Sequence, residues 1–339
     1  MRKLLLVFLV SLLSASLTGC NMGLAYGDPN AIIVVSAEEG WPEMQDSVFA
    51  VLGPDVYTLR TERTFRLTHQ APVGENWLRL RKFKEVVMIG GPDDFWIAEP
   101  LATLDDPGTH PVPGIAQAED VWAKNQHITM MLVDPNGDVS AQVYGMAGEV
   151  HSIIDERFRR GALQRMFVSG TKETLADSLR MTAGFSLTLP EVYQWVATDS
   201  LYIFRNDNPD PAELIRQFGV TWRSPIPDNL TVDSLMDWRE AVADKDYDYP
   251  QVVDRTDLPQ RTLALGDMTV TEVRGAWENP PGSWPAAGPF IFWTVACPEQ
   301  NRLYYLDAWL YAPGKDKWEY ILQLETVMGS FRCGFRAAS

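Results

Sequence analysis

Two runs of aromatic and β-branched residues near the C-terminus constrain the fold more than any other feature of this sequence. Residues 290–296 and 303–311 are separated by the short turn-like segment Pro298-Glu299-Gln300-Asn301. Such residues favour strands, and a four-residue connection joins two strands as an antiparallel hairpin. Residues 268–274 precede the pair with a similar composition. We therefore expect this part of the chain to be built on an antiparallel sheet.

The remaining pattern places helices against sheets in both halves of the chain. Tyr320, Leu324, Val327, Met328 and Phe331 recur at helical spacing, which predicts a terminal helix that packs across the sheet. We predict the α+β class, with mostly antiparallel sheets, helices packed on one face, and two tandem α/β sub-domains. The expected strands are 32–35, 65–69, 86–89 and 128–133, with a hairpin over 185–190 and 195–204; helices are expected from Pro42 onward and over 146–166, 214–218 and 232–242.

The N-terminus has the order of a secretory signal. Arg2-Lys3 is followed by a mostly apolar segment over 4–13 and then by Leu17-Thr18-Gly19-Cys20. The apolar segment is too short to span a bilayer as a helix. Together these features resemble the bacterial lipoprotein signal, which implies that Cys20 is lipidated and becomes the first residue. The expected organisation is a signal peptide over 1–19, a tether over 20–30, and α+β domains over 31–170 and 177–339.

Charge and composition narrow the classes of partner. The chain carries a net charge of −16 and 46% hydrophobic residues. An acidic surface repels nucleic acid and anionic headgroups, so no nucleic-acid partner is expected. The negative charge has two possible roles: it keeps the protein soluble in a crowded compartment, or it attracts a cationic partner.

Two cysteines remain after Cys20. Cys297 and Cys333 are disulfide candidates, because paired thiols in an exported protein are often bridged. Each also lies in an apolar stretch that suits a buried free thiol. We expect no zinc site, since no histidine pair lies near them in the sequence.

No sequence motif predicts catalysis, a metal or a cofactor. The four histidines lack metal-ligand spacing, and neither a serine-nucleophile motif nor a phosphate loop is present. Asp93-Asp94 beside Trp96 is a weak candidate for an acid/base pair, and Asp244, Asp246 and Asp248 are better explained as a solvated acidic loop than as a calcium site. We therefore predict no cofactor, and the catalytic residues remain unknown.

Trp284 is the binding candidate among 12 tryptophans. It lies in Asn279-Pro280-Pro281-Gly282-Ser283-Trp284-Pro285, where little else would bury it. A rigid loop of this kind suits contact with a partner or a glycan, although a loop tip tucked against the sheet explains it as well. Trp195, Trp293 and Trp309 occur in strand patterns and are expected in the core.

A series of short motifs in the last sixty or so residues is distinctive. Arg274-Gly275-Ala276-Trp277, Gly288-Pro289-Phe290, Tyr311-Ala312-Pro313-Gly314-Lys315 and Gln323-Leu324-Glu325 occur in this order. Together they resemble an uncharacterised bacterial lipoprotein family that is catalogued as a domain of unknown function. The second half also resembles the extrinsic photosystem subunit fold. The resemblances imply a fold and a location but no chemistry.

The expected function is therefore that of a lipid-anchored protein of the cell envelope. We expect the outer membrane, facing the periplasm, because Asn21 rather than an aspartate follows Cys20. The membrane would be one partner, through the lipid, and an envelope protein or glycan another. A non-catalytic binding or assembly module is the first hypothesis. A periplasmic hydrolase of glycans or peptidoglycan, or a carrier of an apolar ligand between the sheet and the terminal helix, is the alternative.

Overall fold

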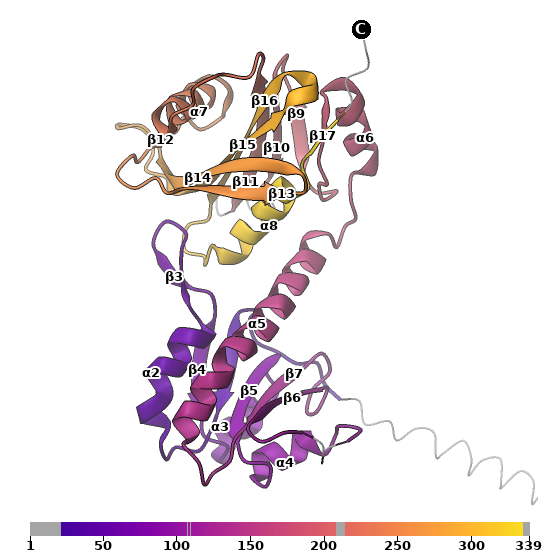
Figure 1. The fold of residues 1–339 in the computed structure, drawn as a ribbon, viewed down its shortest axis with the longest axis vertical. Coiled ribbons are helices and arrows are strands. Elements are labelled where there is room, and N and C mark those ends of the chain that lie inside the picture. Colours follow the sequence, from indigo (N-terminus) through magenta and orange to yellow (C-terminus); the bar gives the residue numbers. More distant parts are fainter. Residues whose placement is uncertain (1–21, 107, 109, 208–213, 335–339) are drawn as a thin grey trace, which may run out of the picture. The chain divides into compact units, whose positions relative to one another are not determined.

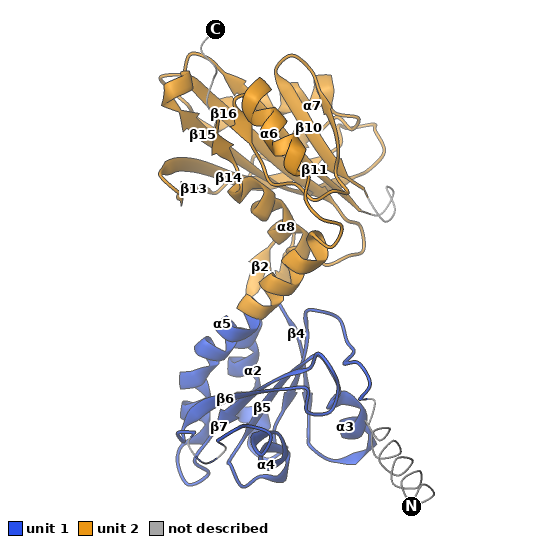
Figure 2. Cartoon of the chain, turned by 90° about the vertical axis from the view of Figure 1, so that its right-hand side faces the viewer, with its two compact units in different colours: residues 1–54, 65–155 blue, residues 55–64, 156–339 orange. Residues whose placement is uncertain are grey.

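The structure is a computed structural model that describes residues 22–106, 108, 110–207 and 214–334 (Figure 1). It divides into two compact units (Figure 2). Unit 1 holds residues 1–54 and 65–155, and unit 2 holds residues 55–64 and 156–339. The division falls inside a long helix at residue 155, not in the polar segment near residue 170. The hairpin over 55–64 belongs with unit 2, although it is flanked in the sequence by unit 1.

Unit 1 contains a five-stranded sheet with the strand order β4-β1-β5-β7-β6. Strands β1, β4, β5 and β7 pair in parallel, and β6 is antiparallel to β7. Helices α3 and α4 pack on one face of this sheet, and α2 and α5 lie on the other (Figure 1). The elements are β1 Ala31–Val35, α2 Trp41–Leu52, β4 Arg66–Gln70, α3 Gly74–Leu80, β5 Glu85–Gly90, α4 Phe95–Leu101, β6 Gly114–Glu119, β7 His127–Leu132 and α5 Val139–Met166.

The parallel pairing in unit 1 follows from its connections. A helix separates β1 from β4 and β4 from β5, and such crossovers return the chain in the same direction. The β6–β7 connection is short, so that pair is antiparallel. The sequence correctly predicted β1, β4, β5, β7 and the helix that begins near Pro42, but neither β6 nor the parallel arrangement. The apolar runs of β1, β5 and β7 are buried on both faces, as is typical of parallel sheets.

Unit 2 is built on an eight-stranded sheet in which all pairs are antiparallel. Its order is β12-β14-β15-β16-β11-β10-β9, with β13 also paired to β14. The elements are β2 Asp55–Tyr57, β3 Thr61–Arg63, α6 Glu173–Thr182, β8 Phe185–Ser186, β9 Gln194–Ala197, β10 Leu201–Asn206, β11 Ile215–Arg223, α7 Val232–Asp246, β12 Val252–Val253, β13 Gln260–Leu265, β14 Met268–Glu278, β15 Ala287–Cys297, the 3₁₀ turn η1 Pro298–Gln300, β16 Arg302–Tyr311, α8 Trp318–Gly329 and β17 Arg332–Cys333.

Both faces of this sheet are covered by helices. Alternate residues of β16 point to opposite sides, so Tyr304 and Leu306 pack with α8 while Tyr305 and Trp309 pack with α7. The α+β class with mostly antiparallel sheets is confirmed, as are the aromatic hairpin and the terminal helix. Helices cover two faces rather than one, because both sides of the central strands are apolar and must be shielded from water.

Two local predictions in unit 2 were wrong. Residues 214–218 were expected to be helical, but they begin strand β11, which lies between β10 and β16. A short apolar run fits either structure, and here the strands on both sides decided it. The predicted hairpin over 185–204 is instead β9 with β10, because β8 pairs with β17 near the C-terminus.

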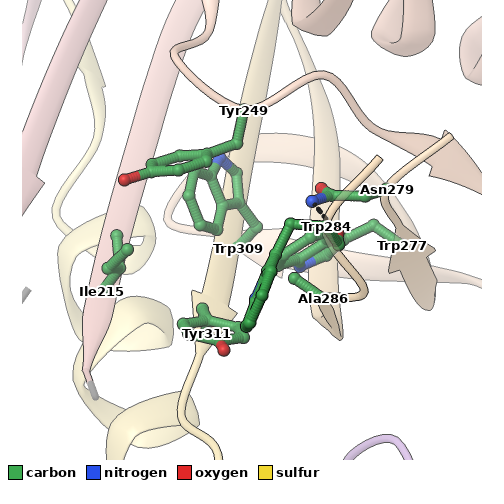
Figure 3. A pocket seen from close by; sticks show the side chains of 8 residues that line it. All are labelled: Ile215, Tyr249, Trp277, Asn279, Trp284, Ala286, Trp309 and Tyr311. Atoms are coloured by element: carbon green, nitrogen blue, oxygen red, sulfur yellow. Dashed lines mark hydrogen bonds between the residues drawn. The ribbon is translucent and has the colours of Figure 1, made fainter. Parts of the chain in front are cut away.

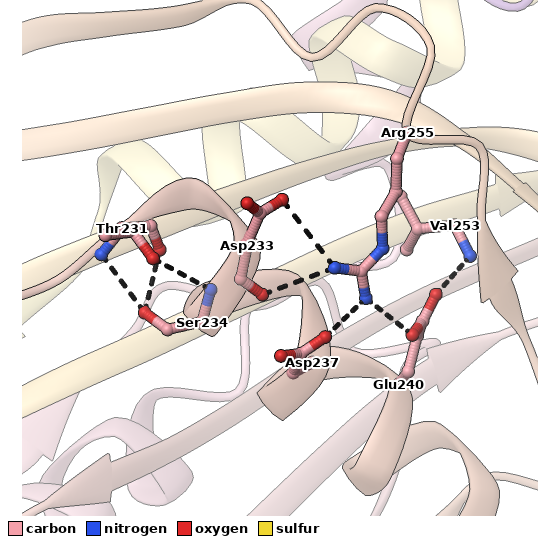
Figure 4. Close-up of polar contacts among 7 residues, drawn as sticks. All are labelled: Thr231, Asp233, Ser234, Asp237, Glu240, Val253 and Arg255. Atoms are coloured by element: carbon pink, nitrogen blue, oxygen red, sulfur yellow. Dashed lines mark hydrogen bonds and ion pairs between the residues drawn. The ribbon is translucent and has the colours of Figure 1, made fainter.

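Helix α7 is fixed at its start and along its exposed side (Figure 4). Thr231 and Ser234 form a reciprocal capping box, in which the side chain of each residue accepts the backbone N–H of the other at the start of the helix. Arg255 then contacts Asp237 and Glu240 at 2.7 and 2.8 Å, so the segment after α7 is held against the helix. These contacts position the chain on both sides of β12, which borders the candidate site.

Within the described residues, no helix is both long enough and apolar enough to cross a membrane.

Candidate functional site

An open pocket walled by aromatic side chains lies at one end of the unit 2 sheet (Figure 3). Its volume is about 370 Å³. It lies on the α7 side of the sheet, so it is not the space between sheet and terminal helix in which the alternative hypothesis of a carrier places an apolar ligand. The lining residues come from β11, the α7–β12 connection, β14, the loop before β15, and β16; they are Ile215, Tyr249, Trp277, Asn279, Trp284, Ala286, Trp309 and Tyr311.

Two buried tryptophans form part of the pocket wall. Trp277 and Trp309 are almost fully buried and meet edge to face, with ring centroids 5.2 Å apart. Gly288 lets β15 approach β16 at this point, because a Cβ there would lie 1.8 Å from the carbonyl oxygen of Leu310 and 2.8 Å from Nε1 of Trp277. This wall is therefore set by the packing of the sheet itself.

The loop that carries Trp284 is held in one conformation by its sequence. Ser283 donates its backbone N–H to the carbonyl of Pro280, and Gly282 has a φ of 87°. A proline followed by a glycine with positive φ is the combination that a type II turn requires. The side-chain amide of Asn279 donates to the carbonyl of Trp284 at 2.7 Å. Trp284 is thus held in place although its side chain is 79% exposed.

The exposure of Trp284 bears on one alternative left by the sequence. The side chain is not tucked against the sheet; it stands at the mouth of the pocket, beside Tyr311 (Figure 3). An exposed indole on a constrained loop can bury both its area and its ring face against a ligand with little loss of conformational entropy. This arrangement is suited to binding.

The pocket carries no charge on its lining side chains, and its polar groups include the hydroxyls of Tyr249 and Tyr311. Asn279 Oδ1, Trp277 Nε1 and Trp309 Nε1 are buried and have no hydrogen-bond partner within the described structure. A buried polar atom without a partner costs about 1–3 kcal/mol. These three atoms are closed off by packing, so they belong to the wall and are not groups that a ligand in the pocket reaches.

A buried polar cluster adjoins the pocket wall and ties α7 to the sheet. Arg239 donates to Asp307 Oδ1 at 2.8 Å and to Gln251 Oε1 at 2.6 Å, and Tyr247 donates to Asp307 Oδ2 at 2.8 Å. Burial, and then the nearby charge of Asp307, raises the pKa of Tyr247 well above its ordinary value. Gly219 makes room for this hydroxyl, because a Cβ there would lie 2.9 Å from it. The cluster is neutral overall and structural.

A second buried carboxylate lies on the opposite side of the sheet. Burial would raise the pKa of Glu272, but hydrogen bonds from Arg274 and Arg261 outweigh it and lower that pKa. Trp293 also donates to this carboxylate at 2.7 Å. The pKa of Glu272 and that of the exposed Asp254 are both lowered. General-acid catalysis at neutral pH needs a raised value instead.

The remaining candidates from the sequence do not assemble into a catalytic or metal site. Cys297 and Cys333 are joined by a disulfide with Cα atoms 5.9 Å apart, and Cys20 lies outside the described residues. Asp94 accepts the backbone N–H of Gly91 at 2.8 Å and so closes the turn before α4. No group of three or more His, Cys, Asp or Glu side chains within the described ranges could hold a metal ion.

Trp195 departs from the expectation for the core tryptophans. Trp293 and Trp309 are buried as expected, but Trp195 is 45% exposed. It lies on β9, the last strand of the sheet, where strand alternation no longer implies burial.

The sequence indicated Trp284 but missed Tyr249, Asn279 and Tyr311, which are far from one another along the chain. It also missed Arg239, the partner of Asp307. The one local signal was Asp307 itself, a single acidic residue inside the apolar run 303–311. A charge at a buried strand position implies a partner elsewhere.

Comparison with known proteins yields weak structural similarities. Cyanobacterial PsbP (CyanoP) from Synechocystis sp. PCC 6803 is 14% identical, with a TM-score of 0.31 over 44% of this chain and 86% of its own. The Saccharomyces cerevisiae Ran-binding protein Mog1p is 8% identical, with a TM-score of 0.31 over 44% and 90%. LpqN, involved in cell envelope biogenesis of Mycobacterium tuberculosis, is 11% identical, with a TM-score of 0.29 over 44% and 83%. Nothing about function follows from similarities of this size.

The sequence comparisons are more specific about the second half of the chain. No curated protein sequence matches this chain. Residues 172–330, which contain the pocket, Trp284 and the aromatic hairpin, match a family described as a domain of unknown function, DUF4837.

Proposed function

We propose that this chain is a non-catalytic binding protein of the cell envelope, anchored to the outer membrane by a lipid on Cys20, with its ligand site in the aromatic pocket. The observation that carries the proposal is Trp284, a highly exposed tryptophan held by a hydrogen-bonded loop at the mouth of a charge-free pocket. A ligand that covers this side chain removes its apolar surface from water, which favours binding.

The chemistry of the lining favours an uncharged glycan. One face of a sugar ring presents C–H groups that pack on the flat face of an aromatic side chain. Its hydroxyl groups both donate and accept, and so can pair with the phenol hydroxyls of Tyr249 and Tyr311, which do the same. A hydrocarbon ligand could pair with neither hydroxyl, and a charged ligand would find no counter-ion among the lining side chains.

Two alternatives have less support. A hydrolase would need two carboxylates with suitable pKa values around a cleft, and the pocket lining has none. A carrier of an apolar ligand fits the aromatic walls but would use neither of the hydroxyls of Tyr249 and Tyr311. Each alternative predicts a different result in the binding experiments described next.

The test is a titration of the purified protein with neutral N-acetylglucosamine oligomers, followed by tryptophan fluorescence. Trp284→Ala should weaken binding about 30-fold, which corresponds to about 2 kcal/mol for a central aromatic contact. Trp195→Ala is the matched control, because it removes an exposed tryptophan from the same sheet outside the pocket. Equal affinities in the two variants would refute the pocket as the site.

Other outcomes identify the alternatives. Binding of the neutral apolar dye N-phenyl-1-naphthylamine, lost in Trp284→Ala, together with no response to the oligomers would favour the carrier. Shortening of the oligomers during the titration would favour the hydrolase. Lipid anchoring is tested separately by labelling cells with an alkyne fatty acid; Cys20→Ser should remove the label and release the protein from membranes.

A further inference from the structure

The end of the tether is fastened to unit 1 between basic residues. Tyr26 exchanges backbone hydrogen bonds with Lys82 and Lys84, its N–H donating to the carbonyl of Lys82 at 3.3 Å and its carbonyl accepting from Lys84 at 2.9 Å. On its other side, Lys124 donates to the carbonyl of Gly23 at 2.9 Å and accepts from Ala25 at 2.8 Å. Three lysines therefore flank the tether.

The tether is also held by side chains. Tyr26 packs edge to face on Phe83, with ring centroids 4.9 Å apart, and its hydroxyl donates to the carbonyl of Arg79. Gly27 has a φ of 105°, and a Cβ there would lie 2.7 Å from the Phe83 ring. The chain thus leaves unit 1 at a defined place, beside these lysines.

The surface beside the tether is basic, although the protein as a whole is acidic. Four of the side chains over 79–84 are basic and none is acidic, whereas the whole chain carries a net charge of −16. Arg79, Lys82, Lys84 and Lys124 are exposed, and no ion pair within the described part of the chain involves them.

The acidic neighbours of these lysines are already engaged. Glu99 pairs with Arg81 at 3.9 Å and accepts the indole N–H of Trp122 at 2.8 Å. Asp120 accepts the backbone N–H of Asn125 at 2.6 Å, and Glu85 is buried. The positive charge of the lysines is therefore available to an external partner.

We infer that Lys82, Lys84 and Lys124 form a docking surface for an anionic lipid bilayer. The inference rests on the proposed anchor at Cys20, two positions before Met22, the first described residue. Two residues span at most about 7 Å, and charges act over about 8–10 Å at physiological salt. The anchor therefore brings the lysines within reach of the headgroups. Leu24, which is 70% exposed, lies on the tether beside Lys124.

The surface acts through charge and orientation. Each lysine near an anionic surface strengthens binding about fivefold, since its contribution is about 1 kcal/mol. Together the three lysines would hold this face of unit 1 against the bilayer, while the negative charge of the rest of the chain disfavours other orientations.

The experiment uses the chain from Met22 onward, which contains every described helix and strand and carries no lipid. Its binding is measured by co-sedimentation with vesicles of phosphatidylcholine alone and of phosphatidylcholine mixed with phosphatidylglycerol. We expect binding to the mixed vesicles only, and its loss at high salt. Neutralising the three lysines (K82Q/K84Q/K124Q) should weaken that binding about 100-fold.

The matched control removes the same charge elsewhere on the surface. Arg160, Arg180 and Lys245 are exposed residues of unit 2, and R160Q/R180Q/K245Q should retain most of the binding. Thermal unfolding of both variants verifies that they are folded.

Several results would overturn the inference. Equal weakening in the two triple variants would mean that net charge alone governs binding. Binding of mixed vesicles that persists in K82Q/K84Q/K124Q, equal binding to neutral vesicles, or no binding to either kind would remove the docking surface. Tighter capture by soluble polyglutamate than by vesicles would assign the lysines to an acidic polymer. Because this chain has no lipid and the pocket is untouched, failure here is distinct from failure of the proposed anchor or ligand.

Discussion

Replacing Asp307 by asparagine tests how the α7 face of the sheet is held together. Asp307 and Arg239 are 5% and 0% exposed, and their side chains meet at 2.8 Å. The guanidinium of Arg239 also lies 4.3 Å from the centroid of the Phe290 ring. Asp307→Asn keeps the size of the side chain but removes the only carboxylate that contacts Arg239 among the described ion pairs. A buried positive charge is then left without a counter-ion.

The expected cost is large compared with the stability of a typical domain. Breaking a buried ion pair by removing one partner costs about 3–5 kcal/mol, against a total of about 5–15 kcal/mol. Replacing the whole polar set is far cheaper, since an apolar substitute of similar volume removes the desolvation penalty as well. The triple variant Arg239→Met, Tyr247→Phe, Asp307→Leu should therefore be at least about 2 kcal/mol more stable than Asp307→Asn.

Urea unfolding followed by tryptophan fluorescence measures both values, because most of the 12 tryptophans lie in unit 2. The free energy of unfolding is extrapolated to water for the wild type, Asp307→Asn and the triple variant. An exposed ion pair contributes at most about 1 kcal/mol to stability. If Asp307→Asn lowers the free energy of unfolding by less than about 1 kcal/mol, the reasoning is refuted. A triple variant no more stable than Asp307→Asn would show instead that packing, not charge, sets the cost.

Three further predictions concern the stability of unit 2. Reducing the disulfide, or replacing Cys297 and Cys333 by serine, should lower the free energy of unfolding by about 4 kcal/mol, since it frees a loop of 36 residues; calorimetry with and without reductant measures this. The lowered pKa of Glu272 means that its contribution is fully present above its ordinary pKa of 4.5 and is lost as pH falls through the lowered value. Glu272→Gln should therefore flatten the acid side of the stability profile, and an unchanged profile would contradict this. Glu62→Ala removes the acceptor of the Lys317 backbone N–H at the start of α8, 2.7 Å away, and should cost about 2 kcal/mol; hydrogen exchange in the first turn of α8 should rise, whereas little change would exclude Glu62 as the cap.

The elements of the fold were largely readable from local patterns. The hairpin β15–β16 and helix α8 were predicted because period and turn chemistry are properties of neighbouring residues. The same is true of the turn Pro280-Pro281-Gly282-Ser283, which predicted a rigid loop around Trp284. Where a short apolar run lacks such a period, as in β11, local sequence does not choose between helix and strand.

The sequence by itself thus determined the hairpin β15–β16, the strands β1, β4, β5 and β7, the helices α2, α5, α7 and α8, and the constrained Trp284 loop. Only the tertiary structure decided which side chains meet. Tyr249, Trp284 and Tyr311 share one pocket because the eight strands adopt a particular order, and Lys124 joins Lys82 because the tether pairs with both segments. The physical reason is that local preferences act over a few residues. Strand order instead reflects the burial of the whole sheet on both faces, which no single segment encodes.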